Sequence, residues 1–175
     1  YLPFVGQQMK DYKVGIVGYG RLGKMMIKFC RAFDAQVFIY DPYSDESNVD
    51  TLEELFDVCD AVSLHVHVTD ETRHMIDYDL LSRGVKFLVN TSRGEVVDEN
   101  DLVKYLKNHT NAFYATDVIS DEINAKENSP IYKYFHESYP NGNVVITPHI
   151  GGMSEGARFL AYNKSVDLLE SYLNE

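Results

Sequence analysis

Short apolar runs alternate with amphipathic stretches along the whole chain. Runs rich in β-branched and aromatic side chains are predicted to be strands, at residues 13–17, 36–40, 61–66, 85–90, 112–118 and 143–147. Helical patterns fill most of the gaps between these runs. Because strands that alternate with helices usually pair in parallel, the pattern predicts an α/β fold with a doubly wound parallel sheet and helices on both faces.

Four stretches have the apolar spacing of helices, at residues 21–33, 51–60, 98–109 and 154–175. In the first stretch, one apolar stripe is expected to face the core, formed by Leu22, Met25, Met26, Phe29, Cys30 and Phe33. The third is expected to turn Leu102, Tyr105 and Leu106 inward. The last has a weaker stripe, formed by Phe159, Tyr162, Val166, Leu169 and Leu173. Residues 120–142 are polar and are predicted to be a long irregular segment.

Composition narrows the class of protein. The 175 residues are expected to form one domain, 1–175, and 45% of them are hydrophobic, which is enough for a full core. The net charge of -11 argues against binding to nucleic acid or to an anionic membrane. Cys30 and Cys59 are not spaced as a disulfide framework, and no apolar run approaches a membrane span. We therefore expect a cytoplasmic protein.

A glycine-rich loop joins the first predicted strand to the first predicted helix. The sequence VGIVGYGRLGKMM contains G-x-G-x-x-G at Gly18, Gly20 and Gly23, with Arg21 and Leu22 between the last two. In a Rossmann fold the first glycine permits a tight turn, the second lets the backbone approach a pyrophosphate, and the third lets helix and strand pack closely. The pyrophosphate then lies on the helix N-terminus, where free N–H groups attract anions.

An acidic residue at the end of the second strand completes this pattern. Asp41 follows Gly23 by 18 residues, where a carboxylate can accept hydrogen bonds from the ribose hydroxyls of adenosine. The same charge disfavours a 2′-phosphate, so the pattern predicts NAD as the cofactor in preference to NADP. The alternative is a glycine turn without a ligand, with Asp41 merely ending its strand before Pro42.

Several further segments, taken together, resemble the NAD-binding domain of the D-isomer-specific 2-hydroxyacid dehydrogenases. The matching segments are VGIVGYGRLGKMM, YDPY (40–43), VSLHVHVTDETRHMI (62–76), LVNTSRGEVVDENDL (88–102), YATDVISDE (114–122) and NVVITPHIGG (143–152). They occur in the order of the family and cover nearly the whole chain. The resemblance implies an NAD-dependent oxidoreductase that moves a hydride between NAD and C2 of a D-2-hydroxy acid.

By this resemblance, three residues carry the chemistry. Arg93 corresponds to the arginine that binds the substrate carboxylate, for which a planar guanidinium offers two charge-assisted hydrogen bonds. His149 corresponds to the acid/base, since an imidazole, with an ordinary pKa of about 6.5, can accept and return the hydroxyl proton near neutral pH. Glu122 corresponds to the carboxylate that fixes the imidazole tautomer and stabilises the imidazolium.

Other residues of the matching segments are expected to line the cofactor. The resemblance assigns Asp117 to the nicotinamide amide and places the rest along NAD, namely His65, Thr91, Ser92, Gly151 and Gly152. Arg93 and His149 are expected to contact the cofactor as well. His65 and His67 form an H-x-H pattern that could indicate a metal site, but no third ligand has supporting spacing, so no metal is expected. His67 stands where many relatives have proline. Asp121 and the long 123–142 segment also depart from the family pattern.

The expected turnover and the expected substrate depend on a second domain that members of the family have. Relatives have a separate substrate-binding domain, mainly before the first strand, and here only YLPFVGQQMKDY precedes that strand. We therefore expect the chain to bind NAD with little or no turnover, and expect the full-length parent to be a homodimer acting on a small 2-hydroxy or 2-keto acid.

Three alternatives compete with the dehydrogenase. Formate dehydrogenase-like chemistry and an adenosylhomocysteine hydrolase cofactor domain fit the motif series less well. The third alternative is an NAD-sensing corepressor built on the same scaffold, which the fold alone does not exclude.

Overall fold

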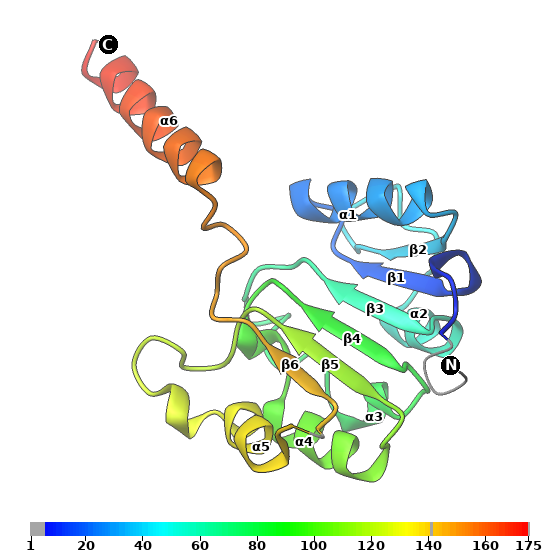
Figure 1. Cartoon of the computed structure of the whole chain (residues 1–175). Coiled ribbons are helices and arrows are strands. Elements are labelled where there is room, and N and C mark those ends of the chain that lie inside the picture. Colours follow the sequence, from blue (N-terminus) through cyan, green and yellow to red (C-terminus); the bar gives the residue numbers. More distant parts are fainter. Residues whose placement is uncertain (1–5, 141, 175) are drawn as a thin grey trace.

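A computed structural model of the protein describes residues 6–140 and 142–174. Its six-stranded sheet has the order β2-β1-β3-β4-β5-β6 (Figure 1). The strands are β1 (Lys13–Val17), β2 (Gln36–Tyr40), β3 (Ala61–Leu64), β4 (Phe87–Asn90), β5 (Phe113–Thr116) and β6 (Val144–Ile146). Every neighbouring pair is parallel, which confirms the predicted doubly wound sheet. Because the order reverses at β1, a crevice for a ligand is expected where the carboxyl ends of β1 and β3 meet.

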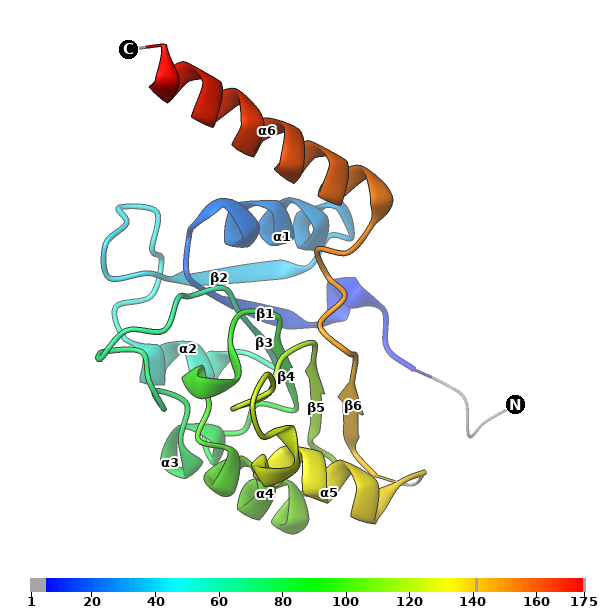
Figure 2. The same ribbon diagram turned by 90° about the vertical axis from the view of Figure 1, so that its left-hand side faces the viewer.

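The helices divide unequally between the two faces of the sheet. They are α1 (Arg21–Ala32), α2 (Leu52–Val58), α3 (Tyr78–Leu81), α4 (Glu99–Asn108), α5 (Pro130–Ser138) and α6 (Glu155–Leu173). Figure 2 shows α1 on one side of the sheet and α2 to α5 on the other. The larger core cluster lies on the second side, and Leu102, Tyr105 and Leu106 of α4 are buried in it as predicted.

The apolar stripe predicted on α1 is confirmed for Cys30, which is buried, and for Met26, which is partly buried against the same cluster, but it is wrong for the other four residues. Leu22, Met25, Phe29 and Phe33 are all more than half exposed. The helix packs on β1 and β2 through Gly23, Ile27 and Cys30, which recur at the i, i+4, i+7 spacing of one helix face, and of these only Cys30 belonged to the predicted stripe. Periodicity identified the helix correctly, but a second, smaller-residue face is the one that meets the sheet.

The segment 120–142 is more ordered than predicted. It contains α5, which begins at the N-cap Ser129, whose hydroxyl accepts from the backbone N–H of Tyr132 at 3.1 Å, with Pro130 at the first helical position. Ile131 is fully buried against the core, so the helix is anchored by its own first turn. The short helix α3, which begins after the N-cap Asp77, was also absent from the prediction.

The last helix, α6, projects away from the sheet (Figure 1), and all its residues are exposed. Its predicted stripe, which runs from Phe159 to Leu173, therefore contacts no core in this structure. None of the helices in the described ranges combines the length and apolar character that a membrane crossing needs. Cys30 and Cys59 are both buried as free thiols, and burial raises the pKa of the Cys59 thiol to about 12.

Candidate functional site

The glycine loop between β1 and α1 has the geometry that its spacing predicts. Gly18 has a φ of +97°, a conformation that favours glycine, and a Cβ there would lie 2.7 Å from the carbonyl oxygen of His65. A Cβ on Gly23 would lie 2.0 Å from the carbonyl oxygen of Gly18. Gly20, by contrast, is the N-cap of α1 and faces open space. The loop therefore leaves room for a ligand at the helix N-terminus, which fits a pyrophosphate.

Asp41 lies beside this loop at the end of β2. One oxygen of its carboxylate accepts from the backbone N–H of Tyr19 at 2.7 Å, and the other accepts from that of Tyr43 at 3.0 Å. The carboxylate therefore touches the glycine loop itself. A cavity of about 680 Å³ opens here, lined by Gly18, Gly20, Asp41 and His65, among others. The cavity suits an adenosine group because a carboxylate, accessible backbone groups and apolar side chains line it together.

His65 extends β3 into the same cavity. Its backbone N–H donates to the carbonyl of Val17 at 2.8 Å, and its Nε2 lies 3.0 Å from the hydroxyl of Ser63. Burial lowers the pKa of His65, so the ring is neutral near pH 7. His67 lines the same cavity. Within the described part of the chain, no group of three or more His, Cys, Asp or Glu side chains could hold a metal ion.

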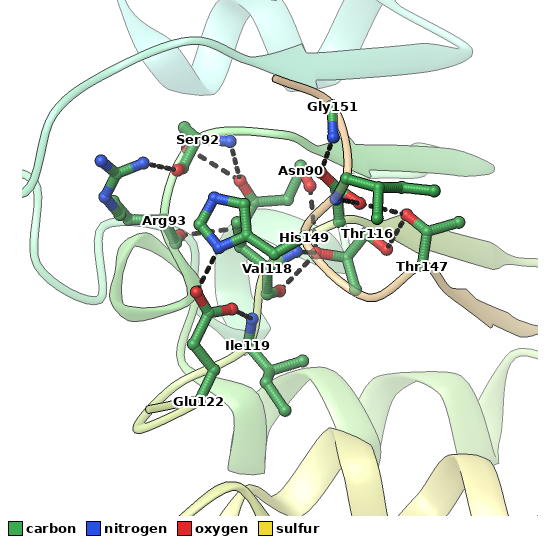
Figure 3. A network of polar contacts seen from close by, with 12 residues as sticks. Asn90, Ser92, Arg93, Thr116, Val118, Ile119, Glu122, Thr147, His149 and Gly151 are labelled. Atoms are coloured by element: carbon green, nitrogen blue, oxygen red, sulfur yellow. Dashed lines mark hydrogen bonds and ion pairs between the residues drawn. The ribbon is translucent and has the colours of Figure 1, made fainter. Parts of the chain in front are cut away.

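The loop that carries Arg93 is organised by a residue that the sequence did not single out. Asn90 is fully buried at the end of β4, where its side-chain oxygen accepts from both the N–H and the hydroxyl of Ser92, at 3.0 and 2.7 Å. Its amide nitrogen donates to the carbonyl of Arg93 at 2.9 Å. The guanidinium of Arg93 donates to the carbonyl of Ser92 at 2.7 Å and is otherwise exposed (Figure 3). Thr91, next to Ser92, is also exposed.

Asp117, at the end of β5, holds the turn that carries His149. Its carboxylate accepts from the backbone N–H groups of Ile150 and Gly151 at 3.0 and 2.8 Å, and also from the hydroxyl of Thr147. His149 itself has a φ of +53°, which is unusual for a residue with a side chain. The turn that aims the imidazole is therefore fixed by a carboxylate from the neighbouring strand. A Cβ on Gly151 would lie 3.1 Å from Asp117, whereas Gly152 is open.

Lowering the pH should weaken the turn that carries His149, because it protonates Asp117. Burial alone would raise the pKa of Asp117, but the hydrogen bonds from Thr147, Ile150 and Gly151 outweigh it and lower that pKa. A carboxyl with a lowered pKa stabilises the fold above its ordinary value of about 3.9, and that contribution is lost as pH falls through the lowered value. The amide proton shifts of Ile150 and Gly151 should therefore titrate together below about pH 4. In Asp117→Asn they should not show this step.

Glu122 and His149 are in direct contact although 27 residues separate them. Oε1 of Glu122 pairs with Nδ1 of His149, and Oε2 accepts from the backbone N–H of Ile119 at 3.3 Å. Figure 3 shows the other ring nitrogen of His149 facing away from Glu122, toward the side of Arg93. A carboxylate on Nδ1 makes Nε2 the nitrogen that is free to exchange a proton.

Arg93, Glu122 and His149 line a single cavity of about 330 Å³. A second cavity, of about 490 Å³, lies on the side of α5 and shares Glu122 and His149 with the first. Asp117 lines this second cavity, and the cavity beside the glycine loop and Asp41 lies nearer β1 and β2. The predicted residues thus form two groups at the carboxyl edge of the sheet. One group suits a dinucleotide, and the other can bind an anion beside a proton acceptor.

Comparisons with known proteins identify the family. The family model described as "D-isomer specific 2-hydroxyacid dehydrogenase, NAD binding domain" matches residues 2–151. The chain is 37% identical over 166 residues to a glyoxylate reductase from Thermococcus litoralis, covering 90% of this chain and 47% of the relative. It is 30% identical over 164 residues to a D-lactate dehydrogenase from Leuconostoc mesenteroides subsp. cremoris, covering 85% of this chain and 49% of the relative.

Solved structures agree with the family match. A D-lactate dehydrogenase from Aquifex aeolicus, solved in complex with NAD and lactic acid, superposes with a TM-score of 0.87 at 26% identity and covers 98% of this chain. This chain covers 56% of that one, and it spans about half the length of the curated relatives above. The predicted fold, family and cofactor are therefore confirmed. The chain belongs to the D-isomer specific 2-hydroxyacid dehydrogenases and is an NAD-binding domain of that family.

Proposed function

We propose that this domain serves an NAD-dependent oxidoreductase acting at C2 of a D-2-hydroxy acid, with Arg93, Glu122 and His149 as its catalytic residues. One observation carries the proposal, namely that these three side chains line one cavity while Glu122 occupies Nδ1 of His149. The relatives named glyoxylate reductase and D-lactate dehydrogenase support a small 2-hydroxy or 2-keto acid as substrate. A binding-only corepressor would not need an acid/base pair beside an exposed arginine.

Each side chain then has a defined role. Arg93 binds the carboxylate of the substrate through its exposed guanidinium, which brings C2 and its hydroxyl next to Nε2 of His149. Bound NAD supplies the hydride acceptor for oxidation, and NADH the donor for reduction. His149 takes the hydroxyl proton at Nε2 during oxidation and returns it during reduction. Glu122 holds the Nδ1 proton and compensates the positive charge that develops on the ring.

Residues near the carboxyl ends of β1, β2, β3 and β5 are proposed to bind NAD. The open N-terminus of α1 at Gly20 receives the pyrophosphate, and Asp41 accepts from the adenosine ribose. Asp117 is proposed to contact the nicotinamide amide in addition to holding the turn after β6. Arg21 and Leu22, in the first turn of α1, and Thr91, directly after β4, are exposed and are also proposed to contact the cofactor.

The 175-residue chain is proposed to bind NAD without efficient turnover. The 175 residues span about half the length of the relatives they match, and aligning a substrate and excluding water are expected to need residues from the rest of such a chain. We also expect the intact enzyme to be a cytoplasmic homodimer. The exposed apolar stripe of α1 supports an interface, because such a contiguous patch usually marks a contact surface.

Titration with NADH, followed by nicotinamide fluorescence, tests the cofactor site. The chain should bind NADH more tightly than NADPH. Asp41→Ser should weaken NADH binding about tenfold or more, since hydrogen bonds to a charged group contribute ~1.5–3 kcal/mol, and it should narrow the preference over NADPH. Asp45→Ser is the matched control, because Asp45 is exposed in the same loop but does not line the cavity. Equal affinity of the unsubstituted chain for both cofactors would contradict the role of Asp41.

A further inference from the structure

A buried carboxylate lies beneath the loop that carries Glu122. Glu99, at the start of α4, is 4% exposed and has no cationic partner among the described residues. One carboxylate oxygen accepts from the backbone N–H of Ser120 at 2.8 Å, and the other accepts from the hydroxyl of Ser129 at 2.6 Å. Burying a carboxylate is costly, and here both of its oxygens are used to hold one segment.

The two serines bracket the segment that carries Glu122. Ser120 lies two residues before Glu122, and Ser129 is the N-cap of α5. Because the Ser129 hydroxyl also accepts from the N–H of Tyr132, the first turn of α5 is tied to the same carboxylate. Glu99 therefore fixes both ends of residues 120–129, and this part of the chain can shift only if a buried charge loses its hydrogen bonds.

The peptide group between Ile119 and Ser120, whose N–H donates to Glu99, also touches the loop that carries Arg93. A Cβ on Gly94 would lie 2.1 Å from the carbonyl carbon of Ile119 and 2.2 Å from the nitrogen of Ser120. The 119–120 peptide is therefore in contact with the backbone of Gly94, while its N–H donates to Glu99. Since Gly94 follows Arg93 directly, this contact joins the loop for the substrate carboxylate to the loop for the acid/base pair.

We propose that Glu99 is a positioning residue for the acid/base pair, acting through Ser120 and Ser129, and that Gly94 sets the distance between that pair and Arg93. The proposal rests on the proposed roles of Arg93, Glu122 and His149. Glu99 touches neither substrate nor cofactor. It holds Glu122 where Oε1 meets Nδ1 of His149, so its loss should impair that contact while leaving the glycine loop and Asp41 intact.

The test observes the Nδ1 proton of His149 by NMR in the chain labelled with ¹⁵N-histidine. A proton held between Nδ1 and a carboxylate gives a strongly deshielded signal, which Glu122→Gln identifies by removing it. Glu99→Ala should abolish this signal while NADH affinity is retained. Glu99→Gln should restore the signal at least in part, because its oxygen can accept from Ser120 and its amide can donate to Ser129. Glu53→Ala is the matched control, as it removes an exposed carboxylate from the first turn of α2.

A second variant covers the case in which Glu99→Ala does not fold. Ser129→Ala removes one of the two contacts of Glu99, so it should weaken the Nδ1 signal without abolishing it. An unchanged signal in a folded Glu99→Ala or in Ser129→Ala would overturn the positioning role. That result is distinct from failure of the proposed function, which would show itself in the unsubstituted chain as absence of NADH binding or of the Nδ1 signal itself.

Discussion

Replacing His149 with asparagine should lower the rate of 2-hydroxy acid oxidation by about 10²- to 10⁴-fold, the usual contribution of a positioned acid/base. Because these 175 residues are proposed to turn over substrate poorly, the rate is measured in a longer form of the enzyme, comparable in length to the relatives that the chain matches. Asparagine keeps a polar side chain of similar size but cannot take a proton from the hydroxyl. NADH affinity should be nearly unchanged, because the glycine loop and Asp41 lie in a separate cavity.

His136→Asn is the matched control for this prediction. His136 is an exposed histidine that lines the cavity on the side of α5, where its ring packs against Tyr132 and Phe135, and no carboxylate among the described residues is hydrogen-bonded to it. Its replacement should leave the rate within the range of the unsubstituted enzyme. Loss of NADH affinity with a retained rate in His149→Asn would refute the acid/base assignment.

Replacing Gly23 with alanine should weaken NADH binding. The added methyl group would lie 2.0 Å from the carbonyl oxygen of Gly18, so either the glycine loop or the first turn of α1 must move. Strain from overpacking is about 1–3 kcal/mol, and if it is relieved at the loop, the dissociation constant rises by roughly five- to 150-fold. Fluorescence titration with NADH measures the change directly.

Alanine variants of two other glycines distinguish the effect of strain within the protein from the effect of a clash with the ligand. Gly156→Ala lies on the exposed helix α6 with nothing near its Cβ, so neither thermal stability nor NADH affinity should fall. The added methyl group of Gly20→Ala would have no atom of the described residues within 4 Å apart from its chain neighbours, yet a pyrophosphate at the start of α1 would meet it. That variant should keep its stability and lose NADH affinity. If Gly20→Ala bound NADH as well as the unsubstituted chain, the pyrophosphate would have to lie elsewhere.

The parts of the fold that could be predicted are those determined by short stretches of the sequence. Apolar runs and their alternation with helices predicted all six strands, because each buried strand needs its own run of β-forming residues. Helix faces were harder. Leu22 and Phe29 form the more apolar side of α1, but the smaller Gly23 and Cys30 pack on the sheet, since a close approach to β1 requires little side-chain volume. Periodicity reveals a stripe without revealing what covers it.

The site was predictable as far as motifs extend. The contact of Glu122 with His149 agrees with the pairing that the resemblance implied, although their roles in catalysis stay predictions. Asn90 and Glu99 were missed because each acts through backbone groups that come together only in the folded chain. Asn90 offered one signal, as a polar residue ending a buried strand. Ser129 with Pro130 offered another, since that pair commonly begins a helix.

The position of β6 at the edge of the sheet has a consequence for the order in which the site is synthesised. The glycine loop, Asp41 and Arg93 precede β6 in the chain, and β6 lies at the edge of the sheet, where it pairs only with β5. His149 follows β6 and is added after all six strands. During synthesis, the residues of the glycine loop and Asp41 are therefore present in the chain before the base that makes the cofactor useful.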